Sequence, residues 1–280
     1  MASPGRSTEG KGQPEALDLA AYLRRLGLDA VPSPDLEGIE TLHRAHLRSI
    51  PFEDIDVWLG HPGGLGLAEL QAKMVRGGRG GYCFEQNTLF AAVLRAVGFP
   101  VRTLEARVRP PGATSPRPRT HMLLEVEVAG RAFAADVGFG GDGPLVPVPL
   151  DGPPIEGPGG CYRVERESGD LHVMRRFQAD AWVDLYAFTR VPAEPVDLEV
   201  AHHYTSTHPR SPFVQTLTVQ RSEPDARFIL RDRSYTVRRG GRDTVRVIDD
   251  DALGPLLKGA FLLRLDACVL SAIRDRLGAP

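Results

Sequence analysis

Three short segments of the chain carry a thiol, an imidazole and a carboxylate. Residues 79–85 surround Cys83, residues 120–122 surround His121, and residues 135–141 surround Asp136. Nucleophilic catalysis by cysteine needs a base that takes the thiol proton and a third group that orients this base. The sequence therefore predicts a catalytic triad of Cys83, His121 and Asp136.

The setting of Cys83 decides whether its thiol is reactive, because a lone cysteine in such a chain is usually a small core residue. Residues 83–97 are largely apolar, contain no proline and end at Gly98, which predicts a buried helix that begins at Cys83. The free N–H groups of its first turn would favour the thiolate, and Gly80 and Gly81 would allow a tight turn before it. Cys161 and Cys268 lack this setting, and we assign them no chemistry.

Residues 120–128 and 131–137 read as a β-hairpin with the two-residue loop Ala129-Gly130. This register puts His121 and Asp136 on one face as diagonal neighbours. It also sets Met122, Leu124 and Val126 opposite Val137, Ala135 and Phe133 as an apolar face. The hairpin therefore brings the base and the carboxylate within reach of each other.

Composition narrows the class of partner. The 280 residues include 34 basic and 36 acidic side chains, a formal charge of −2, which favours a small-molecule substrate over nucleic acid or a membrane. Three widely spaced cysteines argue against a disulfide framework and fit a reducing cytoplasm. Residues 1–15 lack the apolar core of a signal peptide and are predicted to form a flexible tail, and no later run is long enough to span a membrane.

The remaining chain divides into three predicted domains of an α+β protein. Residues 16–100 have helical spacing of apolar residues and carry the nucleophile, and residues 101–190 have short alternating strands, which predict a β-barrel that carries His121 and Asp136. Residues 191–280 predict a smaller α/β unit. In this last unit residues 213–220 read as a strand and residues 253–277 as one helical close.

The same motifs resemble the arylamine N-acetyltransferase family, in which Arg-Gly-Gly-Tyr-Cys-Phe-Glu, Thr-His-Met and Asp-Val-Gly-Phe-Gly segments supply a Cys-His-Asp triad. Order and spacing both match, since His121 follows Cys83 by 38 positions and Asp136 follows His121 by 15. Residues 42–47, 50–56 and 203–213 also look like family segments, so the resemblance runs from about Leu17 to the C-terminus. One departure is Asp54, where the family often has Asn.

The resemblance implies a fold related to the papain-like cysteine enzymes, with a helical domain, a β-barrel and an α/β lid. It also implies ping-pong transfer of an acetyl group from acetyl-CoA, through Cys83, to an arylamine or hydrazine, a cytoplasmic reaction of xenobiotic metabolism. Residues in segments that resemble the family's arylamine pocket are Phe52, Phe139 and Phe213. Candidates for contact with CoA are Thr120, Gly140, Gly141, Thr205, Ser206 and His208.

Several alternatives remain open at this stage. An amide synthase would use the same triad to release a carrier-bound polyketide by joining its thioester to an internal arylamine. A cysteine hydrolase or transglutaminase-like enzyme would use water or a lysine as the acceptor. A non-catalytic binding protein on this fold would not use the triad. His202, His203 and His208 lack the further ligands of a metal site, and we expect no metal. No motif identifies the natural amine or decides between a monomer and a homo-oligomer.

Overall fold

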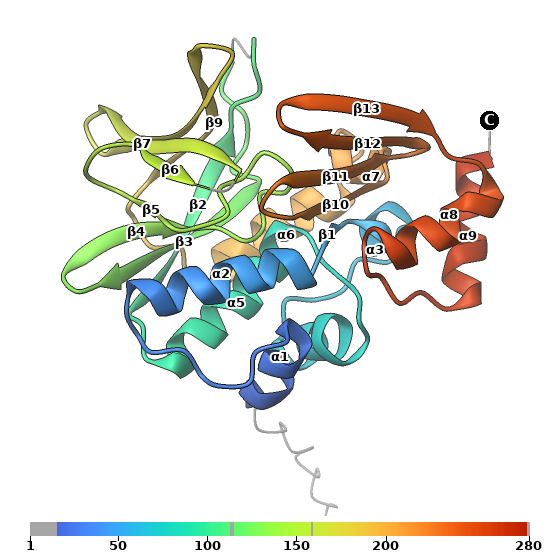
Figure 1. Ribbon diagram of the computed structural model, residues 1–280, viewed down its shortest axis with the longest axis horizontal. Coiled ribbons are helices and arrows are strands. Elements are labelled where there is room, and N and C mark those ends of the chain that lie inside the picture. Colours follow the sequence, from blue (N-terminus) through green and yellow to red (C-terminus); the bar gives the residue numbers. More distant parts are fainter. Residues whose placement is uncertain (1–15, 113–114, 158, 279–280) are drawn as a thin grey trace, which may run out of the picture.

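The computed structural model describes residues 16–112, 115–157 and 159–278. The predicted flexible tail, residues 1–15, lies outside the described residues. The chain begins with helices, continues into a curled sheet and ends in a smaller sheet covered by two helices (Figure 1).

The first part of the chain is helical, as predicted. Its α2 begins where the Asp35 carboxylate accepts a hydrogen bond from the Gly38 N–H, and α1 ends at Gly27 in the left-handed region. The elements are α1 (Leu19–Leu26), α2 (Leu36–Ser49), the two-residue strand β1 (Phe52–Glu53), α3 (Ile55–Trp58), α4 (Leu67–Leu70), the π-helix η1 (Gln71–Arg76) and α5 (Cys83–Val97).

Helix α5 is the central element of this part and confirms the predicted helix over 83–97. It is buried along most of its length, and its apolar residues share one core with β3 of the following sheet. Gly98 ends it in the left-handed conformation. Because α5 is packed against that sheet, its first residue, Cys83, has a fixed position relative to the sheet.

An eight-stranded antiparallel sheet follows, with the strand order β5-β4-β3-β2-β9-β8-β7-β6. The edge strand β5 lies close to β7, so the sheet curls into a nearly closed barrel, which confirms the predicted barrel (Figure 1). The strands are β2 (Val101–Val108), β3 (His121–Val128), β4 (Arg131–Ala135), β5 (Val148–Pro149), β6 (Ile155–Gly157), β7 (Gly160–Ser168), β8 (Leu171–Gln178) and β9 (Ala181–Thr189).

The last part is a five-stranded antiparallel sheet, β1-β10-β11-β12-β13, with helices around it. Strand β1 comes from the helical part, so the first and last parts of the chain share this sheet. The other elements are α6 (Pro195–Thr207), α7 (Pro212–Gln215), β10 (Thr218–Ser222), β11 (Ala226–Arg231), β12 (Ser234–Arg239), β13 (Arg242–Val247), α8 (Asp250–Gly259) and α9 (Ala267–Gly278).

Two predictions for this last part are wrong. Phe213 lies in the short helix α7 instead of a strand, because Pro212 occupies the first helical position behind Ser211. The single helix predicted over 253–277 is two helices, α8 and α9, since the chain turns between them, with Leu262 in the left-handed region. The buried residues Phe261 and Leu263 of this turn had extended the apolar pattern.

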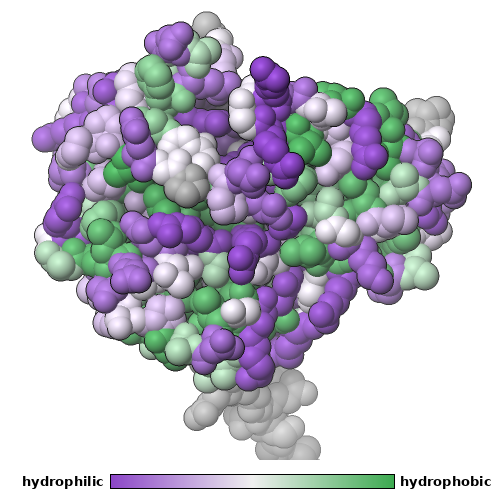
Figure 2. Space-filling view, in the orientation of Figure 1, coloured by the Kyte–Doolittle hydropathy of each residue, from purple (hydrophilic) through white to green (hydrophobic). Residues whose placement is uncertain are grey.

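Hydrophilic and hydrophobic residues are interspersed over the face of the molecule in Figure 2. Within the described ranges, none of the helices combines the length and the apolar character needed to cross a bilayer.

Candidate active site

Cys83 is the first residue of α5, and its side chain lies where the helical part meets the barrel. Only 2% of Cys83 is exposed, and its Sγ lies 3.6 Å from the carbonyl oxygen of Thr120, the residue before β3. The free N–H groups of the first helical turn and the positive end of the helix dipole therefore lie beside the sulfur.

The two glycines before Cys83 have a different role from the predicted one. Neither Gly80 nor Gly81 has a positive φ, so no left-handed turn requires them. A Cβ on Gly80 would instead lie 2.1 Å from the Pro51 carbonyl oxygen, and a Cβ on Gly81 would lie 2.9 Å from the Glu85 side chain. Glycine is needed here because the backbone passes close to its neighbours.

The predicted hairpin is confirmed where its strands pair. Val128 faces Arg131 across the two-residue loop, and Leu124 faces Ala135. The ladder ends there, so Asp136 lies just beyond β4, while His121 is the first residue of β3. Their side chains nevertheless meet, with 2.7 Å between His121 Nε2 and Asp136 Oδ2.

This contact defines how His121 is oriented. Since a carboxylate only accepts, Nε2 donates to Asp136, which leaves Nδ1 available for the Cys83 thiol. Burial alone would lower the pKa of His121, but the Asp136 charge and the bonds to Asp136 and Cys83 outweigh it and raise this pKa from 6.5 to about 10. The imidazole is therefore poised to hold a proton at neutral pH.

Asp136 is buried, and burial opposes its ionisation. The charge of His121 and the hydrogen bonds that it accepts from His121, Asn87 and Gly138 nevertheless lower its pKa below the usual value. Asn87 Nδ2 lies 3.0 Å from Asp136 Oδ1, and the Gly138 N–H donates to the same oxygen at 2.9 Å. Asp136 is thus an ionised carboxylate with all its partners in place.

Two of the supporting residues escaped the sequence analysis. Asn87 follows Cys83 by four positions, so it lies on the same face of α5, and its Nδ2 also donates to the Met122 carbonyl at 2.7 Å. His43, on α2, accepts the backbone N–H of Asp136 through Nε2 at 3.1 Å. The helical spacing could have revealed Asn87, whereas nothing in the sequence relates His43 to Asp136.

Gly138 explains why the segment after Asp136 approaches α5 so closely. A Cβ at this position would lie 2.6 Å from the Cys83 Cα and 2.8 Å from Asn87 Nδ2. Only glycine fits without moving the backbone that carries the thiol. The glycine of the Asp-Val-Gly motif therefore allows the segment that carries Asp136 to lie against the backbone of Cys83.

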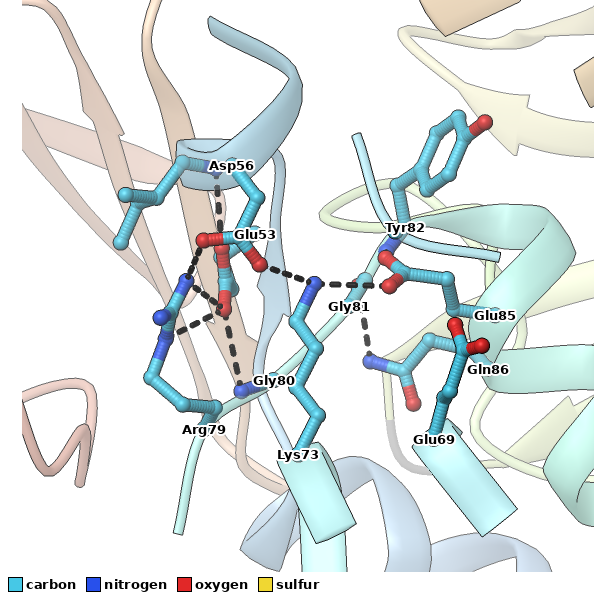
Figure 3. Close-up of polar contacts among 12 residues, drawn as sticks. Glu53, Asp56, Glu69, Lys73, Arg79, Gly80, Gly81, Tyr82, Glu85 and Gln86 are labelled. Atoms are coloured by element: carbon cyan, nitrogen blue, oxygen red, sulfur yellow. Dashed lines mark hydrogen bonds and ion pairs between the residues drawn. The ribbon is translucent and has the colours of Figure 1, made fainter. Parts of the chain in front are cut away.

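A cluster of buried and half-buried ions holds the chain before Cys83 (Figure 3). Lys73 lies between two carboxylates, with Nζ 2.8 Å from Asp56 Oδ2 and 2.7 Å from Glu85 Oε1. Arg79 pairs with Glu53 at 2.9 Å and with Asp56 at 2.8 Å. Glu85 also accepts the Tyr82 N–H at 3.1 Å, so the cluster ends on the residue next to the thiol.

The three candidate pocket phenylalanines fall into two groups. Phe52 and Phe213 face each other with ring centroids 5.8 Å apart. Phe139 lies on the barrel side, where its ring contacts His121 at 5.3 Å and Tyr186 at 5.1 Å. Phe139 and Phe213 are half-buried, so both leave some surface for a ligand.

The six polar candidates differ in how free their groups are. Gly140 and Gly141 follow the Asp136 segment, where the side chain of Gln220 accepts the Gly141 N–H and Arg227 donates to its carbonyl at 2.8 Å. Thr120 is half-buried beside Cys83. The remaining three, Thr205, Ser206 and His208, lie at the end of α6.

The groups at the end of α6 are largely occupied. The Thr205 hydroxyl donates to the Ala201 carbonyl at 2.7 Å and the Ser206 hydroxyl to the His203 carbonyl at 3.3 Å. The His208 ring stacks on Tyr204 with centroids 4.4 Å apart. A contact of any of them with CoA stays a prediction. Among the described residues, no three His, Cys, Asp or Glu side chains form a group that could hold a metal.

Comparison with known proteins places the chain in a family. A family model described as N-acetyltransferase matches residues 35–269. An arylamine N-acetyltransferase of Mycolicibacterium smegmatis is 43% identical over 233 residues, which cover 81% of this chain and 84% of the relative. An arylamine N-acetyltransferase / N-hydroxyarylamine O-acetyltransferase of Salmonella typhimurium is 35% identical, with coverage of 87% and 88%.

Solved structures agree with this assignment. The arylamine N-acetyltransferase of M. smegmatis has a TM-score of 0.88 at 38% identity, covering 94% of this chain and all of that chain. A Mycobacterium marinum arylamine N-acetyltransferase in complex with CoA has a TM-score of 0.86 at 34% identity, covering 93% and 98%. This arrangement of a helical part, a barrel and a smaller α/β part is shared with these acyltransferases. The chain belongs to the arylamine N-acetyltransferase family, as its motifs had indicated.

Proposed function

We propose that this chain transfers an acetyl group from acetyl-CoA to an arylamine or hydrazine in two steps, through an acetyl thioester on Cys83. The observation that carries this proposal is the meeting of Cys83, at the start of α5, with the His121–Asp136 pair. The CoA complex of the M. marinum relative supports CoA as the carrier of the donor group.

In the first half-reaction the Cys83 thiolate attacks the thioester carbonyl of acetyl-CoA. A C–S bond forms to Cys83, and the C–S bond to CoA breaks. The leaving CoA thiolate takes the proton that His121 holds, because the raised pKa keeps this imidazole protonated at neutral pH. Cys83 is then acetylated, and His121 is neutral.

In the second half-reaction the amine nitrogen attacks the acetyl group on Cys83. Neutral His121 accepts the proton that the nitrogen loses, and the C–S bond breaks to return Cys83 as a thiolate. Asp136 keeps Nε2 as the donor and stabilises the imidazolium that forms again. No proton is gained or lost by the enzyme over the full cycle.

The acceptor would lie between the two aromatic groups of the site. An arylamine is largely neutral near pH 7 and flat, so it suits the half-buried rings of Phe139 and Phe213, with Phe52 behind the latter. We assign the CoA chain to the side of Thr120, Gly140 and Gly141, because Thr120 lies beside Cys83 and the two glycines add no side chain.

Mass measurement of the intact protein after incubation with acetyl-CoA tests this function. We expect the wild type to gain the mass of one acetyl group, localised to Cys83, and to lose it again when an arylamine is added. Cys83→Ala should gain none and should show no turnover, because the variant lacks the thiol beside the His121–Asp136 pair.

Cys161→Ala is the matched control, since Cys161 lies on the barrel strand β7 away from the triad, and it should be acetylated as the wild type. If Cys83→Ala turns over like the wild type, or if acetyl-CoA never acylates the wild type, the proposal fails. Acylation only by a carrier-bound chain would favour the amide synthase instead.

A further inference from the structure

Tyr82, the residue before the nucleophile, is buried among aromatic rings from two other parts of the chain. Its ring contacts Phe213 of α7 at 5.6 Å and His202 of α6 at 5.7 Å, both as centroid distances. The proposed mechanism uses neither the Tyr82 hydroxyl nor the His202 imidazole. Tyr82 nevertheless directly precedes Cys83, and its ring contacts both Phe213 and His202.

The two side chains belong to one hydrogen-bonded chain. The Tyr82 hydroxyl bonds to His202 Nδ1, and His202 Nε2 lies 2.9 Å from the carbonyl oxygen of Gly63. A carbonyl only accepts, so Nε2 carries the hydrogen, and in the neutral ring Nδ1 accepts from the tyrosine. Burial, together with the nearby charges of Lys73 and His203, lowers the pKa of His202, which agrees with a neutral ring.

These hydrogen bonds link Gly63, in the 60–66 loop, through His202 on α6 to Tyr82 at the start of α5. Three segments that are far apart in the sequence are therefore joined at Tyr82. Helix α6 also carries α7, because the Ser211 hydroxyl donates to the Thr205 carbonyl between the two helices. The position of Phe213 is thus tied to Tyr82 twice, by ring contact and through α6.

We propose that the Gly63–His202–Tyr82 chain positions Phe213 for the acceptor amine, so that Tyr82 and His202 are positioning residues for the second half-reaction. This inference rests on the proposed function, because it presumes an amine that reacts with acetyl-Cys83. It assigns no role to either residue in the attack on the donor.

The separation between the two half-reactions follows from how Tyr82 itself is held. Its backbone N–H donates to Glu85 and its carbonyl accepts the Gln86 N–H at 2.9 Å, so the start of α5 does not depend on the hydroxyl. Removing the hydroxyl leaves these backbone bonds in place and breaks the side-chain link between Tyr82 and α6. The effect should therefore fall on the amine and spare the thioester.

Steady-state and single-turnover kinetics of the full chain test this proposal. In Tyr82→Phe and in His202→Leu we expect the KM for an arylamine to rise about tenfold, the size of one lost buried hydrogen bond, while CoA release without an amine stays within about twofold. The double variant should be no worse than the worse single variant, because both changes break the same chain.

Two further variants separate positioning from general disturbance. His202→Gln should recover a low KM, since an amide can accept from Tyr82 and donate to Gly63. His203→Leu, at the exposed neighbouring position on α6, should behave as the wild type. Thermal melting identifies which variants are folded. If only one of Tyr82→Phe and His202→Leu folds, that variant alone is sufficient to compare the arylamine KM with the rate of CoA release.

Three results would overturn the proposal: CoA release that falls as much as turnover, an arylamine KM that does not change, or a His202→Gln variant as poor as His202→Leu. A wild type that releases no CoA from acetyl-CoA would be a different result. It would refute the proposed function itself, because the first half-reaction does not involve Phe213.

Discussion

The chain on the two sides of Cys83 is held by different kinds of contact. Before the thiol, Lys73 and Arg79 lie half-buried between the carboxylates of Glu53, Asp56 and Glu85. Beyond it, the Asp136 carboxylate accepts hydrogen bonds from two neutral donors, the Asn87 amide and the Gly138 N–H. The backbone N–H of Asp136 donates to His43. One side is an ionic cluster and the other a network of neutral groups around one ion pair.

The difference separates stability from rate. Buried ions are costly to remove from water, so a cluster of them is stable only when every charge has its partner, and the loss of one partner strands the others. Neutral donors cost less to bury, and together with the charge of His121 they lower the pKa of Asp136. The ionised Asp136 in turn raises the pKa of His121. We expect the ionic side to control whether α5 is in place and the neutral side to control how fast Cys83 reacts.

The largest effect is expected for Lys73→Met, which removes the cation between Asp56 and Glu85. Methionine keeps much of the side-chain volume but leaves the buried Glu85 without its cation, while the half-buried Asp56 keeps only Arg79. Breaking one partner out of a buried ion pair costs about 3–5 kcal/mol of unfolding free energy. Urea unfolding of the variant and the wild type measures this difference.

Lys258→Met is the control for this experiment, because Lys258 is exposed on α8. The same chemical change there should alter the unfolding free energy by less than about 0.5 kcal/mol. If Lys73→Met is as mild as this control, the ionic side does not support the fold as we infer.

A smaller effect, on rate instead of stability, is expected for Asn87→Ala. The variant removes the Asn87 donor from Asp136, and hydrogen bonds to charged groups contribute about 1.5–3 kcal/mol, so kcat/KM for arylamine acetylation should fall roughly 10- to 100-fold. Its unfolding free energy should fall less than that of Lys73→Met.

Thr88→Ala is the neighbouring control on α5, since the Thr88 hydroxyl contacts only the sulfur of Met122 among the described residues. It should retain kcat/KM near that of the wild type. An Asn87→Ala variant with unchanged kinetics but a larger stability loss than Lys73→Met would reverse the comparison between the two sides.

The features of this site that the sequence could predict are short-range ones. The hairpin of β3 and β4 needed only a two-residue loop and an alternating pattern, and α5 needed only an apolar run without proline that ends at Gly98. Both patterns are local, so the relative placement of His121 and Asp136 could be derived by counting.

The features that escaped prediction depend on distant contacts or on weaker local signals. The bond between His43 and Asp136 joins α2 to the end of β4, and no periodicity relates them. The Ser211-Pro212 pair is a helix-start signal, but the apolar residues after it, Phe213 and Val214, also fit a strand. The assignment of Phe213 to a strand was therefore wrong.

The smallest effect concerns Asp54, the one carboxyl of the 53–56 stretch that has no cation in contact within the described residues. Its Oδ1 accepts the Thr218 N–H at 2.8 Å, while Oδ2 is buried without a hydrogen bond. Burial, with a further contribution from the charge of Glu53, raises the pKa of Asp54 well above 3.8. The folded protein therefore holds a neutral Asp54 at pH values where the unfolded chain has ionised it.

This shift makes the contribution of Asp54 to stability depend on pH with a definite sign. A raised folded-state pKa means that the folded protein binds the extra proton, so the contribution is complete below pH 3.8 and is lost as the pH rises. Asp54→Asn removes the titrating proton and keeps the shape of the side chain. Its melting temperature should exceed that of the wild type by a margin that widens from pH 5 to pH 8. We expect this margin to reach a few degrees, since a stability difference of about 1 kcal/mol shifts the melting temperature of a chain of this size by roughly 2–4 °C. A margin that stays constant over this range, or that narrows, would mean that Asp54 is ionised in the folded protein and that the ionic cluster extends to it.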